Sequence, residues 1–98
     1  MRIISLSTLS NFWKSGYGDA EQPLKSWFKE AKNAEWVSPN TIKKNYPSAS
    51  ILNNNRVVFN IKGNTYRLIV RINYDYGIIY IRFIGTHAQY DKIDANIV

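Results

Sequence analysis

The chain has 98 residues, of which 45% are hydrophobic and 20% charged, and this length and composition predict one globular domain spanning residues 1–98. Thirteen Lys and Arg against seven Asp and Glu give a net charge of +6, which favours a polyanionic partner: nucleic acid, an acidic protein or a membrane surface. The lack of cysteine excludes disulfides and thiolate metal sites, and no apolar run approaches the roughly 20 residues that span a bilayer. A single histidine with scattered carboxylates argues against a zinc site, so no metal or other cofactor is expected.

The N-terminal segment lacks a signal-peptide pattern, so a cytoplasmic protein is expected. Residues 2–6 have an apolar centre and predict a short strand. Ser7 is the predicted N-cap of a first helix of about two turns, which a Gly-Tyr-Gly segment ends. The helical spacing of its apolar residues supports this helix: Leu9, Phe12 and Trp13.

The clearest helical pattern follows. Apolar residues repeat at i, i+3, i+4 and i+7 and predict an amphipathic helix that ends near Asn33. The residues of this stripe are Leu24, Trp27, Phe28 and Ala31. Asp19 and Gln22 have the spacing of a capping box at its start.

A third, shorter helix is predicted from Ser38 as N-cap and Pro39 as first residue, because proline is tolerated only in the first turn. It is expected to end at Asn45, since the residue before Pro47 is pushed out of the helical region. Residues 48–55 are predicted to form a loop.

From Arg56 onward the hydrophobic period changes to two, which predicts strands over residues 56–62, 66–72 and 78–84. The turns Gly63-Asn64 and Asp75-Tyr76-Gly77 join them into an antiparallel meander. Gly85 is expected to end the last strand, before a short C-terminal turn or helix that Thr86 or His87 opens. The expected fold class is α+β, with two to three N-terminal helices packed on one face of a twisted antiparallel sheet.

One face of this sheet is expected to form the core with the helices. The helical residues in this core are Leu24, Trp27 and Phe28, and the strand residues are Val57, Phe59, Leu68, Val70, Ile81 and Phe83. The other face is predicted to carry the cations Lys62, Arg67, Arg71 and Arg82, together with Tyr80.

Neighbouring cations repel unless an anion lies between them, and the arginine fork matches phosphate. An anion-binding face is therefore predicted, most naturally for a nucleic-acid backbone. The alternative is an ordinary solvated face on which each arginine pairs with a carboxylate. Few acids are available in this half of the chain for such pairing: Asp75, Asp91 and Asp94.

His87, the only histidine, follows the strand that carries Arg82. Imidazole titrates near neutral pH, so beside phosphate-binding arginines His87 would transfer a proton in phosphodiester cleavage. Tyr90 would stack on a base or donate a hydrogen bond. Plain structural roles remain as alternatives: a surface position for His87 and packing of the terminal turn for Tyr90.

Two segments carry a family resemblance: F-N-I-K-G-N-x-Y-R-L-I at residues 59–69 and G-T-H-x-x-Y-D-K-I at residues 85–93. With Tyr46-Pro47-Ser48-Ala49, they resemble the HigB family of bacterial toxins, within the wider RelE/ParE superfamily. The resemblance implies a RelE-like fold and a ribosome-dependent mRNA endonuclease of a type II toxin–antitoxin system. It also implies a HigA-type antitoxin encoded beside the toxin, with mRNA and the ribosome as partners. DNA would be contacted only indirectly, through the antitoxin complex, and no membrane is implied.

The resemblance also implies roles for residues in a metal-independent reaction, in which the 2′-hydroxyl attacks the adjacent phosphate and the 5′-hydroxyl leaves. Three arginines would hold the phosphate and its developing charge: Arg67, Arg71 and Arg82. His87 would carry a proton, and Lys62 would bind phosphate or activate the attacking hydroxyl. The remaining RNA contacts would come from Tyr80, Tyr90 and Lys92. No carboxylate stands out as a general base.

Three alternatives stay open. A ParE-like toxin of the same superfamily would bind DNA gyrase, although the cationic face and His87 argue against it. A non-catalytic RNA-binding domain is a further possibility. The antitoxin would either cover the cationic face directly or dock on the helices.

Overall fold

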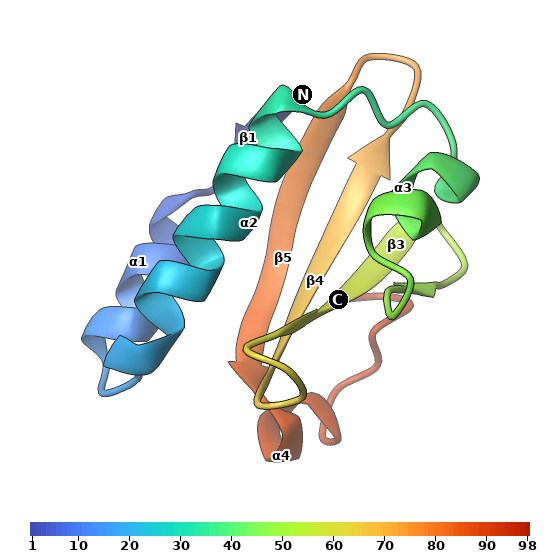
Figure 1. Cartoon of the computed structure of the whole chain (residues 1–98). Coiled ribbons are helices and arrows are strands. Elements are labelled where there is room, and N and C mark those ends of the chain that lie inside the picture. The colour runs from blue at the N-terminus through green and yellow to red at the C-terminus, as the bar shows by residue number, and fades with distance from the viewer.

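The chain folds into an open, twisted five-stranded sheet with helices on one face (Figure 1). The structure is a computed structural model that describes residues 1–98. The elements follow in the order β1 (Arg2–Ile4), α1 (Ser7–Lys14), the 3₁₀ turn η1 (Gly18–Ala20), α2 (Glu21–Asn33), α3 (Pro39–Asn45), β2 (Ser50–Ile51), β3 (Arg56–Ile61), β4 (Tyr66–Asn73), β5 (Ile78–Thr86) and α4 (His87–Tyr90). The strand order is β1-β5-β4-β3-β2. The predicted α+β class is confirmed, and the central meander is antiparallel as predicted. The sheet as a whole is mixed, because β1 pairs with β5 in parallel.

The three predicted N-terminal helices are present, but two of their predicted caps are wrong. Leu6, not Ser7, is the residue before α1. Asp19 belongs to η1 and does not cap α2, because its carboxylate bonds with side chains of the β3–β4 hairpin. The start of α3 is confirmed, with Ser38 as N-cap and Pro39 as its first residue. The hydroxyl of Thr41 donates to the Ser38 carbonyl at 2.6 Å and holds this first turn.

Two strand boundaries also differ from prediction. The short strand β2 lies inside the segment predicted as a loop and pairs with β3. Gly85 does not end β5, which continues through Thr86. Thr86 then caps α4, because the Gln89 amide donates to its Oγ1 at 3.2 Å and its own amide donates to the Gln89 side chain at 2.8 Å.

A β-bulge at Arg82 decides which residues of β5 enter the core. The register shifts from Ile69 opposite Phe83 to Val70 opposite Ile81, so Arg82 has no residue opposite it. Ile84 therefore joins Ile81 on the helical face, and Phe83 turns to the other face. The prediction that Phe83 packs in the helical core is wrong for this reason.

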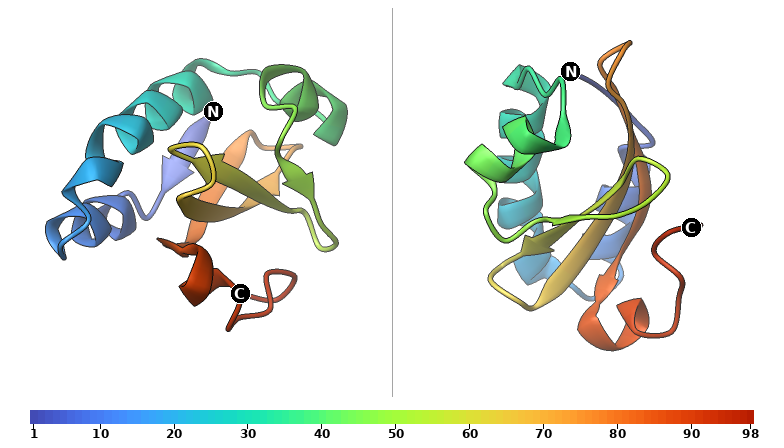
Figure 2. Two further views of the ribbon diagram at one scale, coloured as in Figure 1. Left: turned by 60° about the horizontal axis from the view of Figure 1, so that its bottom comes forward. Right: turned by 90° about the vertical axis from the view of Figure 1, so that its right-hand side faces the viewer.

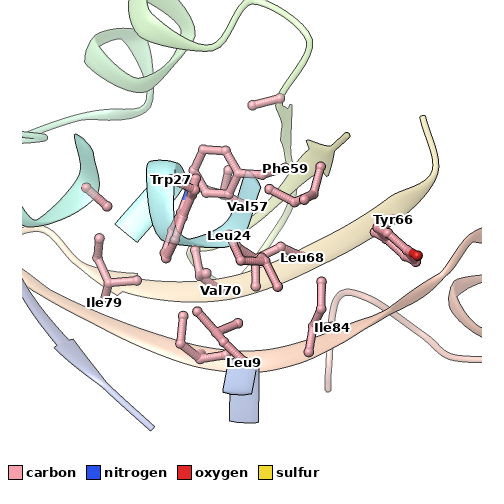
Figure 3. Packing of buried hydrophobic residues seen from close by; sticks show 14 of the residues in the cluster. Leu9, Leu24, Trp27, Val57, Phe59, Tyr66, Leu68, Val70, Ile79 and Ile84 are labelled. Atoms are coloured by element: carbon pink, nitrogen blue, oxygen red, sulfur yellow. The ribbon is translucent and has the colours of Figure 1, made fainter. Parts of the chain in front are cut away.

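The core between helices and sheet otherwise contains the predicted residues, most of which Figure 3 shows. Phe28 is partly buried at the margin of this core. Its largest fully buried side chains include Trp27, Phe59, Leu24, Leu68 and Val70. The rings of Trp27 and Phe59 lie 5.5 Å apart in an edge-to-face arrangement. Burial of each such side chain contributes roughly 1.5–3 kcal/mol to folding.

A second apolar cluster covers the middle of the opposite sheet face. Val58 and Ile69 are buried there against Ala95, with Phe83 and Ile93 packed around them. The C-terminal segment, residues 93–98, supplies this cover. Figure 2 shows it on the side of the sheet away from α2 and α3. Apolar contacts therefore divide the face that was predicted to carry the four cations.

None of the helices is both long enough and apolar enough to cross a bilayer.

Candidate functional site

The first group of predicted site residues lies where β4 begins and β5 ends. Arg67 is opposite Gly85 in the sheet, and its guanidinium carbon is 6.0 Å from the centre of the Tyr90 ring. Arg67 Nη1 donates to the carbonyls of Asn64 at 3.0 Å and Tyr66 at 3.4 Å. We call Arg67, His87, Tyr90 and Asp91 the His87 end of the face. The Tyr90 ring lies between Arg67 and His87 in this group, since its centre is also 6.5 Å from that of the His87 ring.

Gly85 leaves the space beside Arg67 free of a side chain. A Cβ atom on Gly85 would lie 2.6 Å from the Phe83 ring and 2.7 Å from Oε1 of Gln89. Both neighbours are fixed, Phe83 by the second apolar cluster and Gln89 by the cap of α4. Glycine is therefore required here for close packing of α4 on the sheet.

His87 has a carboxylate partner in the residue that ends α4. Nδ1 of His87 is 3.1 Å from Oδ2 of Asp91, one helical turn later. The contact leaves Nε2 of His87 available to a ligand, and 56% of the His87 side chain is exposed. Asp91 is not among the site residues predicted from the sequence. Its i, i+4 spacing from His87 is the signal that could have identified it.

The second group lies farther along β4. Arg71 is opposite Tyr80 on β5 and opposite Arg56 on β3. We call Arg56, Arg71, Tyr80 and Arg82 the Arg71 end of the face. The carbonyl oxygen of Val98 accepts hydrogen bonds from Arg56 Nη2 at 3.1 Å and from Arg82 Nε at 3.2 Å. Arg71 itself is exposed, and its side chain makes no hydrogen bond within the chain.

Distance separates the two ends. Arg67 and Arg71 are four residues apart on one strand, which corresponds to roughly 13 Å. Ile69 lies between them under the second apolar cluster. The predicted site residues therefore lie in two groups on one sheet face, with an apolar cluster between them.

Lys62 is placed differently from prediction. It lies in the β3–β4 turn with a positive φ of 53° and not on the sheet face. Its Nζ is 2.6 Å from the Asp19 carboxylate of the helical layer. Asp19 also accepts a hydrogen bond from the Tyr66 hydroxyl. The Lys62 and Tyr66 bonds hold the pKa of Asp19 below 3.8, and the Asp19 bond raises the pKa of Tyr66 to about 12.

None of the arginines has an Asp or Glu carboxylate within ion-pair distance. The ion pairs of the chain are Lys25–Glu21, Lys62–Asp19 and His87–Asp91. The prediction that the arginines of this face lack acidic partners is therefore confirmed. Lys92 also has no side-chain partner, and it follows α4 at the His87 end. No group of three or more metal-ligating side chains is present.

Comparison with protein families decides the family. Residues 20–93 match the model of a family described as HigB_toxin, a RelE-like toxic component of a toxin–antitoxin system. The chain belongs to the HigB toxin family. The matched region begins just before α2 and ends after α4, so it contains both ends of the cationic face. The resemblance inferred from residues 59–69 and 85–93 is confirmed.

Membership in the HigB family makes the chain the toxic component of a toxin–antitoxin system and implies an antitoxin as its partner. A comparison with curated proteins gives no match. The family also agrees with the architecture, in which helices cover one face of the sheet and leave cations on the other.

Proposed function

We propose that this HigB-family toxin is a metal-independent endoribonuclease that cleaves mRNA on the ribosome and so inhibits translation. The observation that supports this most directly is the arrangement at the His87 end. A half-buried arginine without an acidic partner lies in a group with a histidine whose Nδ1 is paired with a carboxylate. Such a group combines a phosphate ligand with a proton carrier.

In the proposed reaction the 2′-oxygen of RNA forms a bond to the adjacent phosphorus, and the bond from phosphorus to the 5′-oxygen breaks. The proton of the 2′-hydroxyl is removed, and the leaving 5′-oxygen gains one. His87 Nε2 is the proposed carrier for one of these protons. Arg67 donates to the phosphate oxygens, on which negative charge increases in the transition state.

The remaining cations extend this site along the RNA. Tyr90 lies against Arg67 and presents a ring on which a base can stack. We propose that Lys92 and Tyr80 contact RNA. Arg82 lies in the middle of the face and Arg71 lies farthest from His87. In the proposal both arginines bind phosphates of the RNA strand.

We further propose that a HigA-type antitoxin neutralises the toxin. Family membership supports an antitoxin partner, and the HigA type is the one that HigB resemblance suggests. An open reading frame beside the gene that encodes a helix-turn-helix protein would agree with this pairing. The absence of any growth rescue by that protein would contradict it.

The test compares wild type with Arg67→Ala and His87→Ala under inducible expression. Loss of the arginine should slow cleavage of translated mRNA roughly 10²–10³-fold, because one charge-stabilising donor is removed. Loss of the histidine should slow it roughly 10²–10⁴-fold. Lys14→Ala is the control, since Lys14 is an exposed cation on α1, away from the face.

Three results would contradict the proposal in different ways. If both variants arrest growth and cut mRNA like wild type, the assigned residues are wrong. If the wild-type toxin inhibits purified gyrase and leaves mRNA intact, the ParE-like function is correct. If it binds RNA and cuts none, the chain is a binding domain.

A further inference from the structure

A polar hollow at the Arg71 end of the face has no role in the reaction proposed above. Its volume is about 360 Å³. It lies where the β4–β5 turn and the start of β3 meet, and the residues that line it include Asn55, Arg71, Asn73, Asp75 and Tyr80. This volume is within the range of small-ligand sites, which begins at roughly 300 Å³.

Several polar groups of this hollow are free of partners within the chain. No side-chain hydrogen bond is made by Arg71, Tyr80 or Asn55. Asn73 uses its oxygen for the Tyr76 amide at 3.1 Å, which leaves its amide donors free. The Asp75 carboxylate is exposed and has no cation within ion-pair distance. Donors, acceptors and the aromatic residue Tyr80 therefore meet in one concave place.

This combination of groups matches the chemistry of a nucleotide. A guanidinium binds phosphate, a tyrosine ring stacks on a base, and amide and carboxylate groups pair with the edge of a base. A purely anionic ligand would have no use for Asp75, and an apolar ligand would leave Arg71 and Asn55 unpaired.

We propose that this hollow binds one unstacked nucleotide of the mRNA that is cleaved at the His87 end. The inference rests on the proposed function. Arg71 then holds the phosphate of this nucleotide and not the scissile phosphate. Tyr80 stacks on its base, and Asn55 contacts the edge of that base.

The position of the hollow supports a role in substrate choice. It lies on the same sheet face as Arg67 and roughly 13 Å along β4, so a short stretch of one RNA strand can contact both ends. The C-terminal segment covers the apolar surface between them and keeps the two contacts apart. With phosphodiester cleavage at the His87 end and base recognition at the Arg71 end, cleavage would depend on the mRNA sequence next to the cleaved bond.

The backbone at residue 55 offers a matched pair of variants. Asn54 and Asn55 both have left-handed backbones, with φ of 58° and 59°. Glycine accepts this conformation without strain. Asn55→Gly removes a side chain of the hollow, whereas Asn54→Gly removes one that bonds to the Asn96 carbonyl. Thermal unfolding of both variants establishes that they fold.

Mapping of the 5′ ends of cleaved mRNA, after brief induction, is the main measurement. Asn55→Gly should change the relative use of cleavage sites by roughly 2- to 12-fold, as expected for one hydrogen bond to a base. Asn54→Gly should retain the wild-type pattern. Identical patterns in wild type and Asn55→Gly would overturn the inference. So would an equal loss at every site, because it would indicate a nucleotide of ribosomal RNA and not of the mRNA.

Binding of a ten-nucleotide single-stranded RNA separates this inference from the proposed function. The Arg67→Ala, His87→Ala double variant is used so that the RNA stays intact. Adding Tyr80→Leu to it should weaken binding roughly 5- to 150-fold, the effect of one stacked base. If wild type cuts no mRNA and Tyr80→Leu still weakens binding, the proposed reaction fails and the nucleotide site stands. Unchanged binding contradicts the nucleotide site whether or not mRNA is cut.

Discussion

His87 and Asp91 face each other across one turn of α4, and both side chains are more than half exposed, at 56% and 60%. An exposed pair of this kind adds little to the stability of the fold. Its effect is local, because the carboxylate fixes the orientation of the imidazole ring and leaves Nε2 for the substrate. Asp91 is therefore a positioning residue, which acts through His87.

Asp91→Asn should lower the rate of the chemical step and leave the Michaelis constant for RNA unchanged. The loss should be smaller than the roughly 10²–10⁴-fold that proton transfer contributes, since His87 is still present. Single-turnover cleavage of mRNA on purified ribosomes gives both quantities. Asp94→Asn is the matched control, because Asp94 bonds only within its own turn.

A double variant tests whether Asp91 acts through His87. In the His87→Ala background, Asp91→Asn should cause no further loss, because the residue that it orients is absent. Equal effects of Asp91→Asn with and without His87 would mean that Asp91 contacts the RNA itself.

Strand β5 shows how one inserted residue changes the faces of an element. The bulge at Arg82 exchanges the faces of the residues that follow it, so Ile84 enters the core and Phe83 leaves it. The Phe83 ring then lies so close to Gly85 that a side chain at residue 85 would overlap it. The bulge and the glycine together determine how α4 is placed beside Arg67.

Gly85→Ala should destabilise the protein by about 1–3 kcal/mol, because the new methyl group overlaps Phe83 and Gln89. In a domain of this size each kcal/mol lowers Tm by roughly 4–8 °C. Cleavage should fall as well, since α4 carries His87. Gly18→Ala is the control, because a Cβ there meets no atom within 4 Å. Equal melting temperatures for the two variants would show that α4 can shift to accommodate the methyl group without loss of stability.

Local patterns explain which elements can be predicted from sequence. The apolar stripe of α2 and the alternation along β3 and β4 repeat within a few residues, so they are visible without knowledge of the partner surface. The bulge at Arg82 is not visible in this way, because it exists only relative to the opposite strand. If the alternation of faces is continued through the bulge, Phe83 is predicted on the wrong face of the sheet.

At the scale of the whole molecule, the missing information concerns contacts between distant segments. The parallel pairing of β1 with β5 joins the two ends of the chain, and β2 forms only against β3. The C-terminal segment covers Val58 and Ile69 and so separates two groups of cations on the predicted face. The arginines and His87 could be identified from sequence by residue type. Their division into two groups, one at each end of the face, could not be identified in this way.

The helical layer is connected to the β3–β4 hairpin by Asp19, Lys62 and Tyr66, and this connection should depend on pH at both extremes. The pKa of Asp19 is lower in the folded state than its usual 3.8, so its stabilising effect is present above that value and is lost as the pH falls through the folded pKa. The pKa of Tyr66 is raised from 10.0 to about 12, so the neutral phenol stabilises the fold fully below pH 10. This contribution is lost as the pH rises from 10 to 12.

Tyr66→Phe should therefore lower the urea midpoint at pH 7 and make it less sensitive to pH between 10 and 12 than in wild type. Asp19→Asn should weaken the acid dependence below pH 4 and also the alkaline dependence, because both arise from the same hydrogen bond. Tyr46→Phe is an informative control: burial and a hydrogen bond to Glu30 raise the pKa of Tyr46, so it contributes alkaline dependence of its own and none at acid pH through Asp19. A wild-type midpoint that stays constant from pH 10 to 12 would mean that the Tyr66–Asp19 bond does not contribute to stability in solution.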